Sequence, residues 1–142
     1  MNHWQIASWR NRPSQVSISA DITHQGDTAL KIDVTEEADD VSLYQPVSVM
    51  PNQQYRLTGW IKTQDVVVDP QEKGMMTGAC LTLYDQAVST ESILGTNDWK
   101  QITWEFNSGD ASILHIGCRL GNHGSSCTGT AWFDDLKLEK VE

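Results

Sequence analysis

The chain has 142 residues, of which 39% are hydrophobic and 20% are charged, and its formal net charge at pH 7 is −9. This composition is that of a soluble globular protein, and the length allows a sizeable buried core. The negative charge disfavours binding to nucleic-acid phosphates and to anionic membranes. We therefore expect residues 1–142 to form one domain that binds neither a nucleic acid nor a membrane.

Short segments of alternating apolar and polar residues, separated by turn residues, run along the whole chain. This spacing is typical of an all-β sandwich or barrel, and no segment has a convincing helical pattern. The predicted strands, in chain order, are 14–20, 29–34, 41–49, 55–63, 78–85, 99–106, 113–120 and 129–139. Eight strands joined by turns and long loops favour a two-sheet jelly roll.

Consecutive strands of a jelly roll tend to alternate between its two sheets. We expect one sheet to contain the strands at 29–34, 55–63, 78–85 and 113–120. Because side chains alternate between the faces of a strand, the outer surface of that sheet is predicted to collect one set of polar and aromatic side chains. These are Arg56, Thr58, Trp60, Thr82, Tyr84, His115 and Arg119.

Aromatic rings with hydrogen-bonding side chains between them suit a sugar, which offers a C–H face to a ring and hydroxyls to polar groups. The sequence therefore predicts a carbohydrate site in which Trp60 and Tyr84 stack on sugars. Arg56, His115 and Arg119 would bind hydroxyls, or carboxylates if the glycan is acidic. The alternative is that a loop such as 66–77 covers these rings and that the domain has a protein-interaction, structural or oligomerisation role.

The last predicted strand carries a carboxylate among apolar side chains. Strict alternation places Asp134 on the same face as Trp132, Leu136 and Leu138. A carboxylate on an apolar face is costly unless a cation or strong hydrogen bonds meet it. We expect either a bound cation near the end of the sandwich or an Asp134 that accepts hydrogen bonds from backbone amides.

Further expectations concern the remaining tryptophans and the acidic run. Alternation favours Trp99, Trp104 and Trp132 as core residues, and Trp4 and Trp9 as caps at the end of the sandwich. The pairs Glu36-Glu37 and Asp39-Asp40 are interpreted as a solvated acidic loop.

Four segments resemble those of carbohydrate-binding modules of the family 4/9 and family 22 type, which are galactose-binding-domain-like β-jelly rolls. Residues 24–32 are similar to the family's His-x-Gly-x-x-Ser-Leu strand opening, and residues 55–62 to its Tyr-x-hydrophobic-Ser-x-aromatic-hydrophobic-Lys strand. Residues 99–106 resemble its Trp-x-x-hydrophobic-x-x-x-Phe strand, and residues 132–136 its closing Asp-Asp-Val run. The segments occur in the family's order and span most of the chain.

The resemblance implies a structural calcium and a groove for a glycan chain. Asp134 falls on the family's metal-binding Asp, and the loop Gln25-Gly26-Asp27 falls where backbone carbonyls complete the coordination. Gln5 stands where the family usually has a Glu, so a neutral oxygen replaces a carboxylate ligand. Trp60 falls on a groove tryptophan and Tyr84 near a second aromatic residue. The relatives are attached to glycoside hydrolases, which implies an extracellular or periplasmic module that works with such an enzyme.

The residues offer little support for catalysis. The four histidines show no His-x-His spacing, no Gly-x-Ser-x-Gly occurs, and no carboxylate pair is expected beside His115 and Arg119. We therefore expect a non-catalytic module rather than an enzyme. Oligomeric state is left open.

The first residues and the cysteines leave the compartment open. No basic and apolar run follows Met1, so either the protein is cytoplasmic or the sequence begins after a removed leader or an upstream domain. Cys118 and Cys127 could form a disulfide that leaves Cys80 free. Alternatively, all three cysteines are reduced and serve as small apolar residues.

Overall fold

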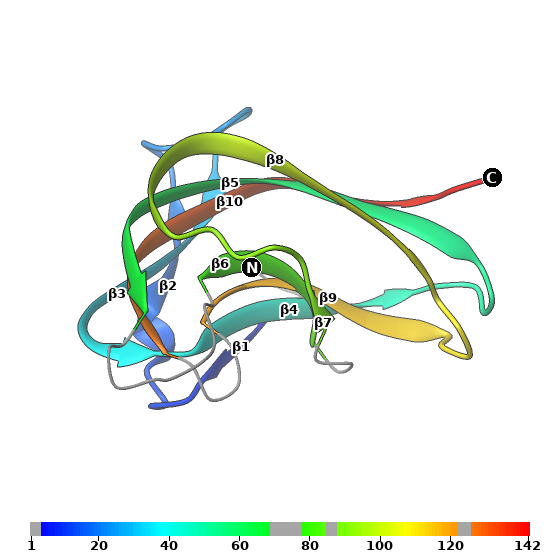
Figure 1. The fold of residues 1–142 in the computed structure, drawn as a ribbon, viewed down its shortest axis with the longest axis horizontal. Coiled ribbons are helices and arrows are strands. Elements are labelled where there is room, and N and C mark those ends of the chain that lie inside the picture. Colours follow the sequence, from blue (N-terminus) through cyan, green and yellow to red (C-terminus); the bar gives the residue numbers. More distant parts are fainter. Residues whose placement is uncertain (1–3, 69–77, 85–87, 122–125) are drawn as a thin grey trace.

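The computed structural model describes residues 4–68, 78–84, 88–121 and 126–142. These residues form two five-stranded antiparallel sheets, which confirms the predicted all-β, two-sheet jelly-roll sandwich (Figure 1). Sheet A has the strand order β1 (Gln5–Ser8), β4 (Val41–Ser48), β9 (Ile113–Leu120), β6 (Ala79–Leu83) and β7 (Val88–Ser89). Sheet B has the order β2 (Val16–Ser19), β3 (Ala29–Asp39), β10 (Cys127–Lys140), β5 (Gln54–Val68) and β8 (Gly95–Asn107).

A short 3-10 turn, η1 (Pro13–Gln15), precedes β2. The strands β1 and β7 were not predicted from the sequence. None of the described residues belongs to a helix that is long and apolar enough to cross a membrane.

The core lies between the two sheets and follows from the alternation of the strands. In β5, Leu57 and Ile61 point inward and have no exposed surface, while Thr58 and Trp60 between them are partly exposed. Leu43 of β4 and Leu81 of β6 face them from sheet A and are equally buried. Burial of one such side chain contributes roughly 1.5–3 kcal/mol. The apolar residues at every second position therefore hold the two layers together.

The predicted grouping of strands into sheets is wrong. The strands at 29–34 and 55–63 belong to sheet B, as parts of β3 and β5, whereas those at 78–85 and 113–120 correspond to β6 and β9 of sheet A. The chain changes sheet after each long strand from β3 onward. As Figure 1 shows, β5 lies in the upper layer with β8 and β10, while β6 lies in the lower layer with β4 and β9.

A bulge in β10 changes which side chains face the core. The pairing of β10 with β5 shifts between Asp134 and Lys137, and Asp135 has a φ of 53°. Before the bulge Phe133 is in the core, and after it Leu136 and Leu138 pack against the core. Because an extra residue in a strand reverses the alternation, Asp134 does not share the face of the two leucines, contrary to the sequence prediction.

Two of the predicted core tryptophans lie on the outer face of sheet B. Trp132 pairs with Lys31 and Lys62 on its neighbouring strands, and the Lys31 ammonium lies 5.7 Å from the ring centroid. Although it lies on the outer face, Trp132 is buried, with 3% of its surface exposed. Trp99 contacts His24 outside the sheet, whereas Trp104 packs against the core as predicted.

Candidate functional site

The seven predicted ligand-binding residues lie on two opposite faces of the molecule. Because β5 and β6 belong to different sheets, the prediction that they form one surface is wrong. The outer side of sheet A carries Thr82, Tyr84, His115 and Arg119, and the outer side of sheet B carries Arg56, Thr58 and Trp60. Whether each residue binds a ligand stays a prediction.

The outer side of sheet A also carries Tyr44, which the sequence reading missed; we call the surface made by Tyr44, Tyr84, His115 and Arg119 the tyrosine face. The rings of Tyr44 and Tyr84 are stacked with centroids 4.0 Å apart and planes 7° apart. The His115 ring meets Tyr44 edge-on at 5.9 Å. Alternation with the buried Val41 and Leu43 would have placed Tyr44 on an outer face.

Gly117 allows this arrangement. It lies on β9 directly between Tyr44 of β4 and Thr82 of β6. A Cβ at position 117 would lie 2.3 Å from the Leu43 carbonyl oxygen and 2.8 Å from Tyr44 Cβ. Because no side chain is present there, the Tyr44 ring reaches across β9 to the ring of Tyr84.

Arg119 is the most unusual polar residue of the tyrosine face. Its side chain is only 1% exposed, and its Nη2 lies 2.8 Å and 2.9 Å from the two carboxylate oxygens of Asp40. Its Cζ lies 5.9 Å from the centroid of Tyr84. Among the described residues, nothing accepts a hydrogen bond from the buried Nε and Nη1. Such donors are costly to leave unpaired.

Asp40 owes its position to a buried carboxylate next to it. Asp39 is 0% exposed. It accepts hydrogen bonds from Ser8 Oγ, from Gln15 Nε2 at 2.8 Å and from the backbone amides of Arg10 and Asp40 at 3.1 Å and 2.8 Å. The prediction of a solvated acidic loop is therefore wrong for these two aspartates. Side-chain exposures of 86% and 69% show that Glu36 and Glu37 are solvated as predicted, but both belong to β3 rather than to a loop.

Burial sets the protonation of two groups on this side of sheet A. It raises the pKa of Tyr44, and the neighbouring Tyr84 raises it further, so the Tyr44 hydroxyl stays protonated at neutral pH. Burial also raises the pKa of Cys80 to about 11. Cys80, Cys118 and Cys127 are all buried and form no disulfide, so the reduced alternative is correct. Burial also raises the pKa of Cys118, which makes Cys80 and Cys118 unreactive because the thiolate is the nucleophilic form.

The outer side of sheet B holds a separate depression, which we call the Trp60 groove. The His24 ring covers one face of Trp60, with centroids 3.9 Å apart and planes 17° apart, and His24 Nδ1 lies 2.8 Å from Asp135 Oδ2. The groove has a volume of about 490 Å³. It is lined by Gln25, Arg56, Thr58, Trp60, Gln101, Thr103, Asp135, Lys137 and Glu139. Arg56 is paired with Glu105 at 3.2 Å.

The residues around Asp134 do not fit the calcium site that the resemblance implies. Asp134 Oδ2 accepts hydrogen bonds from the amides of His24 and Gln25 at 2.9 Å and 3.2 Å, and Oδ1 accepts one from the amide of Asp135 at 2.8 Å. The loop therefore presents N–H donors to the carboxylate, whereas calcium needs oxygen ligands. The Gly26 carbonyl oxygen accepts a hydrogen bond from the Thr23 hydroxyl.

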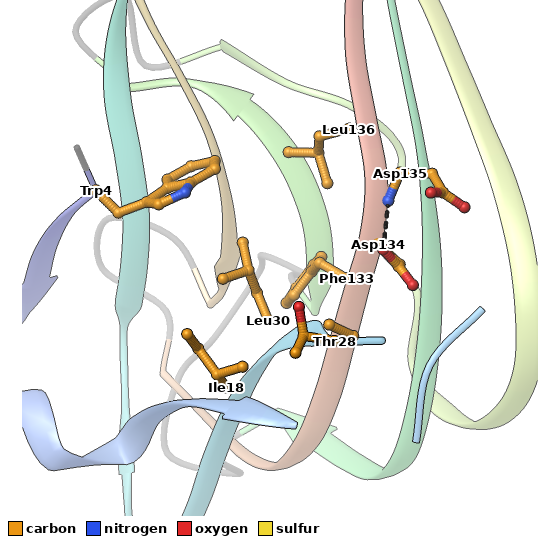
Figure 2. A pocket seen from close by; sticks show the side chains of 9 residues that line it. Trp4, Ile18, Thr28, Leu30, Phe133, Asp134, Asp135 and Leu136 are labelled. Carbon is orange, nitrogen blue, oxygen red and sulfur yellow. Dashed lines mark hydrogen bonds between the residues drawn. The ribbon is translucent and has the colours of Figure 1, made fainter. Parts of the chain in front are cut away.

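Two further residues, Gln5 and Asp27, were expected to bind the ion. Gln5 is part of β1 in sheet A, and Asp27 is exposed. Among the described residues, no group of three or more acidic, histidine or cysteine side chains could hold a metal ion. In Figure 2, the carboxylates of Asp134 and Asp135 lie on one side of β10, and the apolar lining of an adjacent pocket of about 410 Å³ lies on the other. Whether the chain binds calcium stays a prediction.

Asp134→Ala is expected to lower the free energy of unfolding by about 1–3 kcal/mol, because three backbone amides lose their acceptor. Removal of calcium with a chelator is expected to leave the melting temperature of the wild-type protein unchanged. Calorimetry with and without EDTA measures both effects, with the exposed Asp27→Ala as the control. A fall in melting temperature on chelation that added calcium reverses would contradict this account.

A two-sheet β-sandwich with aromatic and hydrogen-bonding side chains on an outer sheet face is the architecture of a jelly-roll carbohydrate-binding module. The sequence profile of the family described as "Carbohydrate binding domain" (families 4 and 9) matches residues 4–116. The chain belongs to this family, which confirms the resemblance seen in the sequence. A comparison with curated proteins gives no match.

Solved structures share the fold at low sequence identity. TmCBM61 in complex with β-1,4-galactotriose is 19% identical, with 97% of this chain and 88% of that chain covered and a TM-score of 0.59. The xylan-binding CBM22-1 domain of Xyn10C from Paenibacillus barcinonensis is 13% identical, with 99% and 86% covered and a TM-score of 0.56. An arabinose-bound α-L-arabinofuranosidase, MgGH51, is 16% identical, with 97% and 23% covered and a TM-score of 0.60.

Proposed function

We propose that the chain is a non-catalytic module that binds a glycan chain on its tyrosine face. The observation that carries this proposal is the pair of parallel rings of Tyr44 and Tyr84 on the outer side of sheet A. These rings would pack against sugar C–H groups. Arg119 is 1% exposed, so its Nε and Nη1, which find no acceptor among the described residues, would bind sugar oxygens once the groups that bury them move aside. An aromatic contact contributes roughly 0.5–1.5 kcal/mol. Binding is therefore expected to be weak, on the order of micromolar to millimolar.

The charges on this face favour a neutral glycan. Asp40 binds Arg119 with both carboxylate oxygens, so the cation is already neutralised. The formal net charge of the chain is −9, which repels an acidic polymer at long range. We therefore propose hydroxyl recognition by Arg119 and by His115, rather than recognition of uronate carboxylates.

The proposed partner enzyme is a glycoside hydrolase, which the module would direct to a polysaccharide in an extracellular or periplasmic setting. The support is indirect: the chain has the fold of a part, 23%, of the arabinofuranosidase MgGH51. Calcium has no place in the proposed mechanism. We propose that the module itself is non-catalytic, because glycosidases use two converging carboxylates. On the tyrosine face, the Asp40 carboxylate is already paired with Arg119.

The Trp60 groove is the second candidate location for a glycan. Arg56, Thr58 and Trp60 of β5 line it together. The sequence analysis predicted this grouping, because the three residues alternate along one strand. The tyrosine face is preferred because it brings two aromatic rings together, whereas Trp60 is the one aromatic side chain among the described residues that line the groove.

Affinity gel electrophoresis on soluble neutral polysaccharides tests the proposed function. We expect the protein to be retarded by at least one of xylan, β-1,4-galactan and mixed-linkage β-glucan, and to run freely in polygalacturonate. Free migration in all the neutral gels would contradict the proposal. Self-association in sedimentation experiments in that case would favour the alternative, a structural or protein-interaction domain.

A further inference from the structure

Trp9 is the most exposed of the large hydrophobic side chains that the structure describes, at 82%. We propose that Trp9 is a second contact for the glycan, placed beyond the tyrosine face along the outer side of sheet A. This inference rests on the proposed function and extends it, because it makes the site select long chains over short ones.

The register of β1 and β4 places Trp9 on the same side as the tyrosine face. Ile6 pairs with Leu43 and packs against the core, so Ala7, the next residue, points outward. Trp9 follows two residues later, and its amide donates to the Asp40 carbonyl at 3.1 Å, which continues the register. Residues opposite each other in an antiparallel pair point to the same face, and the Asp40 carboxylate turns to Arg119 on the outer side.

The strand positions between the two aromatic contacts carry small side chains, and Ser42 among them is buried at 2% exposure. Gln5 pairs with Tyr44, and the next outward pair is Ala7 with Ser42, whose side chains are small. Asp40, the partner of Trp9, is four residues from Tyr44 along the chain, or about 13 Å at the rise of an extended strand. Arg119 pairs with Ser42 and therefore lies beside this path. Such a span exceeds one sugar ring, so only an oligosaccharide reaches both contacts.

The backbone at Trp9 is fixed before any ligand arrives. Asn11 donates its amide to the Ser8 carbonyl at 3.0 Å, and Arg12 donates its amide to Ser8 Oγ at 3.0 Å. Asn11 adopts a φ of 56°, which closes the turn after β1. A held backbone reduces the entropy lost when a side chain binds, so an exposed tryptophan at this position suits a binding contact.

Isothermal titration of the wild-type protein and of Trp9→Ala with a long and a short neutral ligand tests the inference. The probes are β-1,4-galactan with β-1,4-galactobiose, and xylan with xylobiose. For Trp9→Ala we expect an affinity for the polysaccharide about tenfold lower and an unchanged affinity for the disaccharide. Ile18→Ala, which truncates a side chain that is 50% exposed on β2, is the matched control and should change neither.

Tyr84→Ala separates this inference from the proposed function. If the tyrosine face binds glycans, Tyr84→Ala weakens both the long and the short ligand. Equal polysaccharide affinities for the wild type and Trp9→Ala would overturn the inference while leaving the proposed function intact. Unchanged binding by Tyr84→Ala, or no binding of any probe by the wild type, would overturn both.

Discussion

Asp39→Ala is expected to lower the free energy of unfolding by about 3 kcal/mol and the melting temperature by roughly 10 °C. Asp39 has no exposed surface, and its carboxylate accepts four hydrogen bonds that tie β1 and η1 to the end of β3. Its removal leaves the amides of Arg10 and Asp40 and the side chains of Ser8 and Gln15 without an acceptor. Denaturant unfolding followed by tryptophan fluorescence measures the loss.

The same carboxylate gives the stability a defined pH dependence. Burial alone would raise the pKa of Asp39, but the hydrogen bonds from Ser8, Gln15 and the two amides outweigh burial and lower it. The stabilisation is therefore fully present above the pKa of an unfolded aspartate, about 3.9, and is lost as the pH falls through the lower folded value. The difference between wild type and Asp39→Ala should shrink below about pH 4.

Glu36→Ala is the matched control, because Glu36 belongs to the same acidic run but has a side chain that is 86% exposed. Its effect on stability should stay within about 0.5 kcal/mol. Equal effects of Glu36→Ala and Asp39→Ala would show that the acidic run is solvated throughout, and that the account of Asp39 is wrong.

Arg119→Ala is expected to cost about 3 kcal/mol of stability and to abolish detectable glycan binding. It leaves the Asp40 carboxylate, 13% exposed, without its cation, and it removes two N–H donors that find no acceptor in the part of the chain that the structure describes. The double variant Arg119→Ala/Asp40→Ala removes both charges. It should therefore be more stable than Arg119→Ala alone, because an uncompensated buried charge costs more than the loss of a pair.

The double variant also separates folding from binding. If the free donors of Arg119 bind sugar oxygens, the double variant folds but gives no retardation in the neutral polysaccharide gels. Recovery of both stability and glycan binding in the double variant would show that Arg119 acts only as the partner of Asp40. Near-UV circular dichroism checks that the double variant is folded when its glycan binding is measured.

The fold was predictable because its signals are local. Alternating residues such as Tyr55, Leu57 and Ile61 mark a strand within a few positions, and turn residues mark its ends. The number of predicted strands added the jelly roll, and the four family segments added the family. These signals say nothing about which strands become neighbours, since pairing joins residues that are far apart in the sequence.

The candidate site was predicted less well for two physical reasons. Trp60 and Tyr84 were assigned to one sheet by a counting rule, whereas β5 and β6 lie in opposite layers. Asp134 was assigned to the core face by strict alternation, which the bulge at Asp135 reverses. The burial of Asp39 left no sequence signal, because an acidic run usually is solvated.

The central claim is that the glycan binds to the tyrosine face of sheet A. The most direct measurement is the affinity of Tyr84→Ala and Trp60→Ala, side by side, for whichever neutral polysaccharide retards the wild type. Our account predicts that Tyr84→Ala loses at least tenfold in affinity and that Trp60→Ala binds like the wild type. Loss of binding in Trp60→Ala with full retention in Tyr84→Ala would contradict it and assign the glycan to the Trp60 groove.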